Sequence, residues 1–260
     1  MPIRVGHSAD PDDAFMVWAL EAGAVDTRGL ELKPVVSDIQ TLNEWALEGR
    51  LEVTALSAGA YPAVSDRYLL LPHGASFGDG YGPVLVAREE LDPAGVEIVT
   101  PGPLTTARRV LQLALGEGIR TRDLPFDQVL DEVVSGRAEA GLLIHEGQLT
   151  YADAGLVKLL DLGAWWQENV ALPLPLGLVA IRRDVEAAAD ASAVLKEAIV
   201  AGLANRDDAM AYAMGFGRGI DRDTADRFVA MYVNDLTLDM GPRGREAVAR
   251  LLGRDPEFVP

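Results

Sequence analysis

The chain has 260 residues, a formal net charge of −17, 49% hydrophobic residues and no cysteine. Its length and apolar content are typical of a globular protein that folds as one large domain or as two lobes. The negative charge argues against nonspecific binding to nucleic acid or to an anionic membrane, and the lack of cysteine excludes disulfides, thiolate metal sites and a cysteine nucleophile.

Residues 1–15 lack the apolar core of a signal peptide, because Asp10, Asp12 and Asp13 follow one another closely. No apolar run along the chain approaches the roughly 20 residues of a membrane-spanning helix. We therefore expect a cytoplasmic protein that acts on a small molecule and has neither nucleic acid nor membrane as a partner.

Strand-like and helix-like segments alternate over residues 1–57. Asp12 is the expected N-cap of the first helix and Gly23 its expected stop. The alternation predicts a parallel sheet covered by helices. The expected strands are 3–8, 30–37 and 52–57, and the expected helices are 12–23 and 39–49.

A second alternating unit follows the glycine-rich stretch 78–82, which we interpret as a hinge turn because it lacks the strand–glycine–helix context of a nucleotide loop. From Asp184 onward the pattern is almost wholly helical. The expected strands of this unit are 83–88, 96–102, 138–147, 156–163 and 175–183, and the expected helices are 104–115 and 126–136.

Two expected strands, near 83–88 and 176–182, stand at the beginning and the end of this second unit, where the chain would cross between two lobes. The arrangement resembles an α/β, two-lobed fold of the periplasmic-binding-protein type (type II). It predicts one lobe from residues 1–88 and 180–260, and an inserted lobe from residues 89–179. In such folds the ligand lies between the lobes, beyond the carboxyl ends of the strands.

Several polar residues lie at such strand ends. Ser8 and Ser57 each follow an expected strand, and Ser57 is either a donor to a ligand oxygen or a hydroxyl that satisfies its own turn. Thr105 and Thr106 begin an expected helix, whose unpaired N–H groups can hold a carboxylate without any lysine. The alternative for Thr105 is that it only caps that helix.

His145 follows the apolar residues 142–144 directly. Such a histidine is either a general base in the cleft or a strand-end residue that bonds a backbone carbonyl. No cluster of ligands at metal spacing surrounds it, and no Gly-x-Ser-x-Gly elbow occurs, so we expect neither zinc nor a serine hydrolase. The acids around Asp12 are expected to complement a helix terminus and not to bind Mg²⁺.

Successive motif blocks run along the chain: HSADPDDAF, SDIQTLNEWA, AYPAVSDRYLLLPHGASFGDGYGPVLVAR, TPGPLTTA, GLLIHEGQLTY, DLGAWWQENVALPLPLG and MYVNDLTLDMGPRG. Together they resemble the MqnD family, the 1,4-dihydroxy-6-naphthoate synthases of the futalosine route to menaquinone. Residues 144–147, Ile-His-Glu-Gly, are the most specific match. The opening block departs from the family, with Ala9 and Asp10 before Pro11 and with Asp12 where the family more often has Asn, so another substrate within the superfamily stays open.

The resemblance implies a carbon–carbon lyase that converts cyclic dehypoxanthine futalosine to 1,4-dihydroxy-6-naphthoate without a metal or redox cofactor. It assigns His145 as the base, which we expect the backbone around Glu146 and Gly147 to orient. Ser8, Ser57, Thr105 and Thr106 then become the expected donors to the substrate and its carboxylate. The alternatives are a cytoplasmic small-anion binding or sensor protein of the same fold, and a chorismate-dehydrating enzyme, which the histidine block disfavours.

Overall fold

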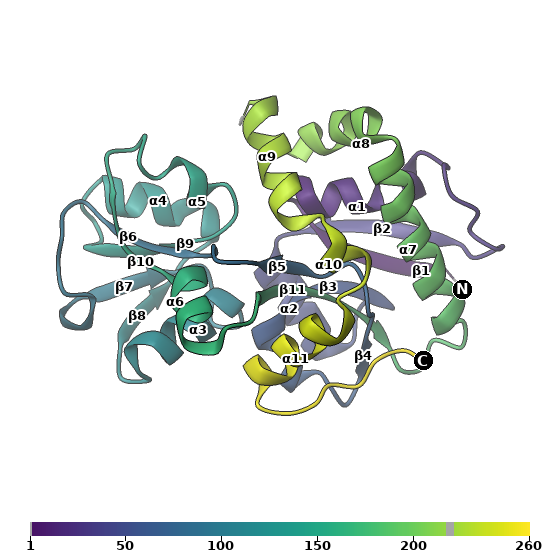
Figure 1. The fold of residues 1–260 in the computed structure, drawn as a ribbon, viewed down its shortest axis with the longest axis horizontal. Helices are drawn as coiled ribbons and strands as arrows, with labels where there is room; N and C mark the ends of the chain where they lie inside the picture. Colours follow the sequence, from purple (N-terminus) through teal and green to yellow (C-terminus); the bar gives the residue numbers. More distant parts are fainter. Residues whose placement is uncertain (1, 217–220) are drawn as a thin grey trace.

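The computed structural model describes residues 2–216 and 221–260. It forms two α/β lobes side by side, each with its own sheet, and both ends of the chain lie in the same lobe (Figure 1). The predicted fold class is therefore confirmed. Within the described residues, no helix combines the length and apolar character that crossing a membrane requires.

The first lobe is built on a sheet with the strand order β2-β1-β3-β11-β4, and β5 pairs with β11 beyond this path. As the alternating pattern predicts, β1 runs parallel to both β2 and β3, whereas β11 is antiparallel to its neighbours. The strands are β1 (Ile3–Ser8), β2 (Leu32–Ser37), β3 (Val53–Ser57), β4 (Tyr68–Leu70), β5 (Ser76–Gly78) and β11 (Leu174–Arg182).

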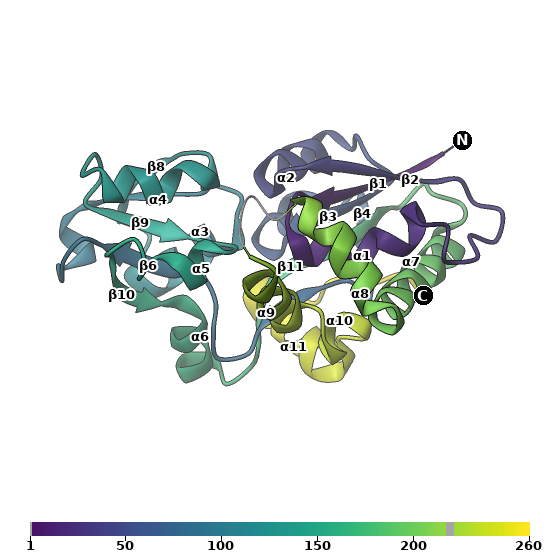
Figure 2. The ribbon, with the colours of Figure 1, turned by 90° about the horizontal axis from the view of Figure 1, so that it is seen from above.

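Helices cover this sheet, and most of them come from the C-terminal part of the chain that the sequence predicts to be helical (Figure 2). Phe15 and Ile199 are buried in a cluster that packs α1 against α7, α8 and α9. The helical elements are α1 (Pro11–Glu21), α2 (Ile39–Glu48), η1 (Ala58–Ala63), α7 (Ala188–Ala204), α8 (Arg206–Ala213), η3 (Met214–Phe216), α9 (Arg222–Tyr232), α10 (Asp235–Leu238) and α11 (Gly241–Leu252).

The second lobe is built on a sheet with the strand order β10-β6-β9-β7-β8. Val99, Val129 and Val133 lie in the buried cluster between this sheet and α4. The strands are β6 (Val84–Ala87), β7 (Glu97–Thr100), β8 (Arg120–Asp123), β9 (Ala140–Leu143) and β10 (Val157–Asp161), and the helical elements are η2 (Pro93–Gly95), α3 (Thr106–Leu115), α4 (Phe126–Val134), α5 (Gly147–Thr150) and α6 (Leu162–Val170).

The two strands expected at the crossings between the lobes lie in different sheets. β6 pairs with β9 and β10 of the second lobe, and β11 pairs with β3 of the first, so sheet membership differs from the predicted boundaries at 88/89 and 179/180. The reason is that β6 finds its partners later in the chain, a pairing that its apolar pattern does not specify. We propose that the lobes join at the linkers 79–83 and 171–173.

The linker at 79–83 packs closely against the start of α6. A Cβ atom added to Gly163 would lie 1.9 Å from the carbonyl carbon of Tyr81, and one added to Gly78 would lie 2.0 Å from its oxygen. Because real Cβ atoms do not approach backbone this closely, glycine is required at both positions. The crossing between the lobes is thus fixed by backbone packing.

Candidate active site

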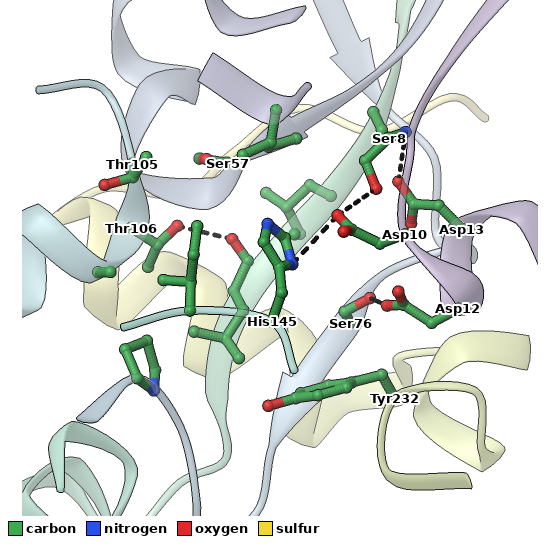
Figure 3. A pocket seen from close by; sticks show the side chains of 18 of the residues that line it. Ser8, Asp10, Asp12, Asp13, Ser57, Ser76, Thr105, Thr106, His145 and Tyr232 are labelled. Atoms are coloured by element: carbon green, nitrogen blue, oxygen red, sulfur yellow. Dashed lines mark hydrogen bonds and ion pairs between the residues drawn. The ribbon is translucent and has the colours of Figure 1, made fainter. Parts of the chain in front are cut away.

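A cavity with an empty volume of about 700 Å³, including the part open to solvent, lies between the lobes. All five residues singled out in the sequence line it, although they come from both lobes: Ser8, Ser57, Thr105, Thr106 and His145 (Figure 3). Apolar groups make up much of the remaining wall, namely Ile39, Ala55, Pro83, Ala107, Ile144, Leu176, Leu178 and Phe228. Its volume and mixed lining are those of a small-molecule site.

His145 stands at the turn between β9 and α5. Its φ of 54° is in the left-handed region, which His, Asn and Asp enter more readily than other non-glycine residues. The Nδ1 atom lies 3.1 Å from Oδ2 of Asp10, and the ring packs edge-on against Phe126 with centroids 4.9 Å apart. Asp10 of the first lobe therefore contacts the ring directly, and an orienting role of the backbone around Glu146 and Gly147 stays a prediction.

The other ring nitrogen of His145 points away from Asp10 (Figure 3). This Nε2 atom is buried, and across residues 2–216 and 221–260 it has no hydrogen-bond partner. An unpaired polar atom is costly in a protein interior and calls for an explanation, of which a catalytic role is one. His145 thus has one ring nitrogen, Nδ1, that contacts Asp10, and one, Nε2, that has no hydrogen-bond partner among the described residues.

Three carboxyl groups surround the start of α1. The backbone N–H of Ser8 donates to Asp13 Oδ2 over 2.8 Å, and the Ser8 hydroxyl donates to Asp10 Oδ2 over 2.7 Å. Burial, followed by the charges of Asp13 and Asp10, raises the pKa of Asp12 well above its ordinary value, and burial also raises the pKa of Asp13. Asp12 accepts a hydrogen bond from the Ser76 hydroxyl over 3.4 Å.

The predicted cap of this helix is corrected. Asp10, not Asp12, occupies the N-cap position, and its side chain caps none of the described backbone amides. The acidic residues at the helix start were expected to complement the helix terminus. Asp10 instead directs its carboxylate across the cavity to His145.

The hydroxyl groups of Thr105 and Thr106 are engaged by the protein. Thr105 caps α3: its Oγ1 accepts from Arg108 N over 3.3 Å and donates to the Gly102 carbonyl over 2.8 Å. Thr106 Oγ1 donates to the Leu176 carbonyl over 2.6 Å and accepts from Gly59 N over 3.1 Å. A hydroxyl has one proton to donate, so neither side chain offers it to a ligand in this arrangement.

Ser57 is held differently. Its Oγ accepts from Asn43 Nδ2 over 3.0 Å, and its backbone N–H donates to the side-chain oxygen Oδ1 of Asn43 over 2.8 Å. In the part of the chain that the structure describes, the Ser57 hydroxyl proton has no recorded acceptor. Ser57 can therefore donate into the cavity, with its orientation fixed by Asn43.

Sequence reasoning missed several residues of the site, among them Asn43, Ser76, Gln148 and Tyr232. Tyr232 donates from α9 of the first lobe to Gln148 Oε1 of the second over 3.0 Å, and burial raises its pKa. All four lie within motif blocks quoted above, so the sequence contained a signal for them that was not assigned to a site. No group of three or more acidic or histidine side chains among the described residues is arranged to hold a metal ion.

Sequence comparison identifies related proteins over nearly the whole chain. The profile of a family described as menaquinone biosynthesis matches residues 3–256. A protein of Thermus thermophilus named 1,4-dihydroxy-6-naphthoate synthase is 41% identical over 255 residues, covering 96% of this chain and 92% of the relative. A Streptomyces coelicolor protein of the same name is 33% identical, covering 97% and 92%.

Structural comparison agrees with these matches. A crystal structure of a protein from Archaeoglobus fulgidus has a TM-score of 0.93 and 48% identity, covering 97% of this chain and 96% of that one. A Candida albicans protein described as having the generic periplasmic binding protein fold has a TM-score of 0.71 at 10% identity, covering 97% and 89%. The second likeness concerns the fold alone.

Proposed function

The chain belongs to the menaquinone biosynthesis family, and from that premise we propose that it is a 1,4-dihydroxy-6-naphthoate synthase. The reaction is a carbon–carbon cleavage that converts cyclic dehypoxanthine futalosine to 1,4-dihydroxy-6-naphthoate and a small sugar-derived fragment. The observation that carries the proposal is the buried, unpaired Nε2 of His145 in the interlobe cavity, where a base would meet an enclosed ligand.

His145 is the general base of this proposal. With Asp10 accepting a hydrogen bond at Nδ1, the lone pair of a neutral imidazole lies on Nε2, where it can take a proton from the substrate. Removal of this proton starts the C–C cleavage, and the ring system becomes aromatic as the bond to the sugar-derived part breaks. These steps move protons and electron pairs within the substrate, so the proposed reaction needs no redox cofactor.

The substrate carboxylate is proposed to bind opposite the acidic loop. Ser57 and the first residues of α3, Thr106 and Ala107, line the cavity on that side, and we assign the donors to the Ser57 hydroxyl and to the first backbone N–H groups of α3. A helix N-terminus favours a negative charge, whereas the carboxyls near Asp12 disfavour one. This assignment replaces the hydroxyls of Thr105 and Thr106 with backbone donors. The cytoplasmic location expected from the sequence remains a prediction.

The test is an assay of the purified protein with cyclic dehypoxanthine futalosine, in which formation of the naphthoate product is followed by its absorbance. We expect turnover by the wild type and a kcat about 10²–10⁴-fold lower for His145→Asn, since a lost general base has this effect. Asn tolerates the left-handed backbone of this position, so the melting temperature should stay within a few degrees. A His145→Asn enzyme with near-wild-type kcat contradicts the catalytic role.

The same assay separates the alternatives. A binding or sensor protein of this fold would bind the substrate without forming product, and His145→Asn would then change affinity alone. A chorismate-dehydrating enzyme would consume chorismate and leave the futalosine derivative intact. Product formation from the futalosine derivative alone distinguishes the proposed function from both.

A further inference from the structure

We propose that Asp10 is a positioning residue for the His145 base and that it acts from the opposite lobe. The inference rests on the proposed function, because it assigns a role to Asp10 in the proton transfer that His145 carries out. Asp10 follows β1 in the first lobe, whereas His145 follows β9 in the second, and their side chains meet across the cavity (Figure 3).

Asp10 is well placed to hold the imidazole. Its side chain is 3% exposed, and its Oδ2 lies 3.1 Å from His145 Nδ1 and 2.7 Å from the Ser8 hydroxyl that donates to it. Two donors therefore converge on one carboxylate oxygen, which fixes the direction of the carboxylate. Phe126 also packs against the imidazole ring, with centroids 4.9 Å apart, and limits its rotation.

The pairing selects one tautomer of the neutral imidazole. A carboxylate oxygen accepts hydrogen bonds, so the ring proton is favoured on Nδ1 and the lone pair on Nε2. A base oriented by a third group is a recurring arrangement in enzymes that transfer protons. Without Asp10, the proton can move to Nε2, and that nitrogen is then unable to accept one.

Because Asp10 and His145 belong to different lobes, the choice of imidazole tautomer depends on how the lobes are placed relative to each other. Because each lobe supplies one partner, the 3.1 Å contact exists only while the two lobes lie as close as they do here. The base consequently acquires its defined tautomer in the arrangement that also encloses the ligand. An enclosed site strengthens the electrostatic effect of the carboxylate and keeps water away from the reacting groups.

Asp10→Asn tests the role, because it removes the charge and keeps the size of the side chain. We expect kcat to fall at least about tenfold and by less than in His145→Asn, while the substrate dissociation constant changes by less than about threefold. The control is Asp38→Asn, which alters a carboxylate bonded to Thr41 at the start of α2, outside the cavity. The control should keep wild-type kcat.

Nitrogen-15 NMR of the imidazole rings reports which ring nitrogen carries the proton, and a purely structural role of Asp10 would leave this unchanged. The chain has three histidines, so the spectrum of His145→Asn assigns the His145 signals by difference. At about pH 8, where an ordinary imidazole is neutral, the wild type should show a protonated Nδ1 and an unprotonated Nε2. In Asp10→Asn we expect a substantial shift toward the Nε2–H form.

Two results would overturn the proposal: a wild-type His145 with its proton on Nε2, or an Asp10→Asn protein with unchanged kcat and an unchanged His145 spectrum. The first needs no variant, so misfolding of Asp10→Asn does not prevent the test. If the wild type fails to form the naphthoate, the proposed function fails, and the spectra still report whether Asp10 sets the tautomer.

Discussion

Asp12 is a buried carboxyl beside two other carboxyls, and its raised pKa reflects first its burial and then the charges of Asp13 and Asp10. A carboxyl whose pKa is higher in the folded state makes the protein less stable as pH rises. The stability that protonated Asp12 contributes begins to fall above about pH 3.8, the pKa of this carboxyl in the unfolded chain. It is lost once the pH exceeds the pKa in the folded protein. The Asp12 carboxyl therefore makes the fold less stable at neutral pH than at acidic pH.

Asp12→Asn should consequently become more stable relative to the wild type as pH rises from about 3, where the carboxyl is largely protonated in both states, to about 7. For a chain of this size, each kcal/mol corresponds to a rise of about 2–4 °C in Tm. Urea denaturation of both proteins at the two pH values measures the effect. A stability of the variant relative to the wild type that does not rise between the two pH values contradicts the assignment.

His73 gives a pH dependence of opposite sign. Burial, and then the charge of Lys196, lowers its pKa from 6.5 to about 4, while Nε2 lies 2.9 Å from the Ser192 hydroxyl. Its contribution to stability is fully present above pH 6.5 and is lost as pH falls toward about 4, because the unfolded chain takes up the proton first.

His73→Gln keeps a polar group for Ser192 but cannot titrate. Between about pH 7 and pH 4 the wild type should lose about 3 kcal/mol more unfolding free energy than the variant, as an upper value from 1.36 kcal/mol for each pKa unit. The difference between the two stability–pH curves measures the effect of His73 alone. Parallel curves would show that His73 does not titrate in this way.

At the residue scale, the sequence predicted the location of the site better than its contacts. His145, Ser8 and Ser57 were found because polar residues at strand ends converge in an α/β fold. Asp10 was assigned to the helix terminus because its true partner is far away in the chain and in the other lobe. The pairing depends on how two sheets are placed, which local patterns do not encode.

At the element scale, alternation predicted β1, α1, β2, α2 and β3 with their parallel pairing, because each βαβ unit is a local arrangement. The sheet membership of β6 was not predicted. This strand pairs antiparallel with β9 and β10, and its four buried residues would suit a central position in either sheet. An apolar run predicts that a strand is buried but not which strands lie beside it.

The crossing between β5 and β6 supports a prediction at this scale. In Gly163→Ala the new Cβ would lie 1.9 Å from the Tyr81 carbonyl carbon, so the linker or α6 must move. We expect a loss of about 1–3 kcal/mol, typical of overpacking against a rigid neighbour. Chemical denaturation checks it. The matched control is Gly118→Ala, whose added Cβ meets no described atom within 4 Å and should cost little.

At the scale of the whole molecule, hydrogen bonds join the lobes around the cavity. Thr106 of α3 bonds to Leu176 and Gly59 of the first lobe, and Tyr232 of the first lobe bonds to Gln148 of the second. Buried clusters also continue across the junction, since Leu56 and Leu178 share one cluster with Leu85 and Leu142. The two lobes are therefore held together around the cavity by contacts on several sides.

Thr106→Val removes one of these connections without changing the side-chain volume much. It leaves the Leu176 carbonyl and the Gly59 N–H without their partner, which should cost about 1–3 kcal/mol of stability and raise KM as the lobes separate more easily. Thr105→Val should also cost about 0.5–2 kcal/mol, as a lost cap, but leave KM unchanged. Equal KM increases in both variants would instead favour the Thr hydroxyls as substrate ligands.

Asp10 and His145 lie on opposite sides of the cleft, so their contact forms only when the two lobes are close together. Under the proposed mechanism, a substrate bound to one lobe alone would meet an imidazole without a defined tautomer, and the reaction would start only after bulk water is excluded. The two-lobed scaffold itself is shared with a protein described as having the generic periplasmic binding protein fold. On such a scaffold, a carboxylate on one lobe and a histidine on the other would make proton transfer depend on closure of the lobes.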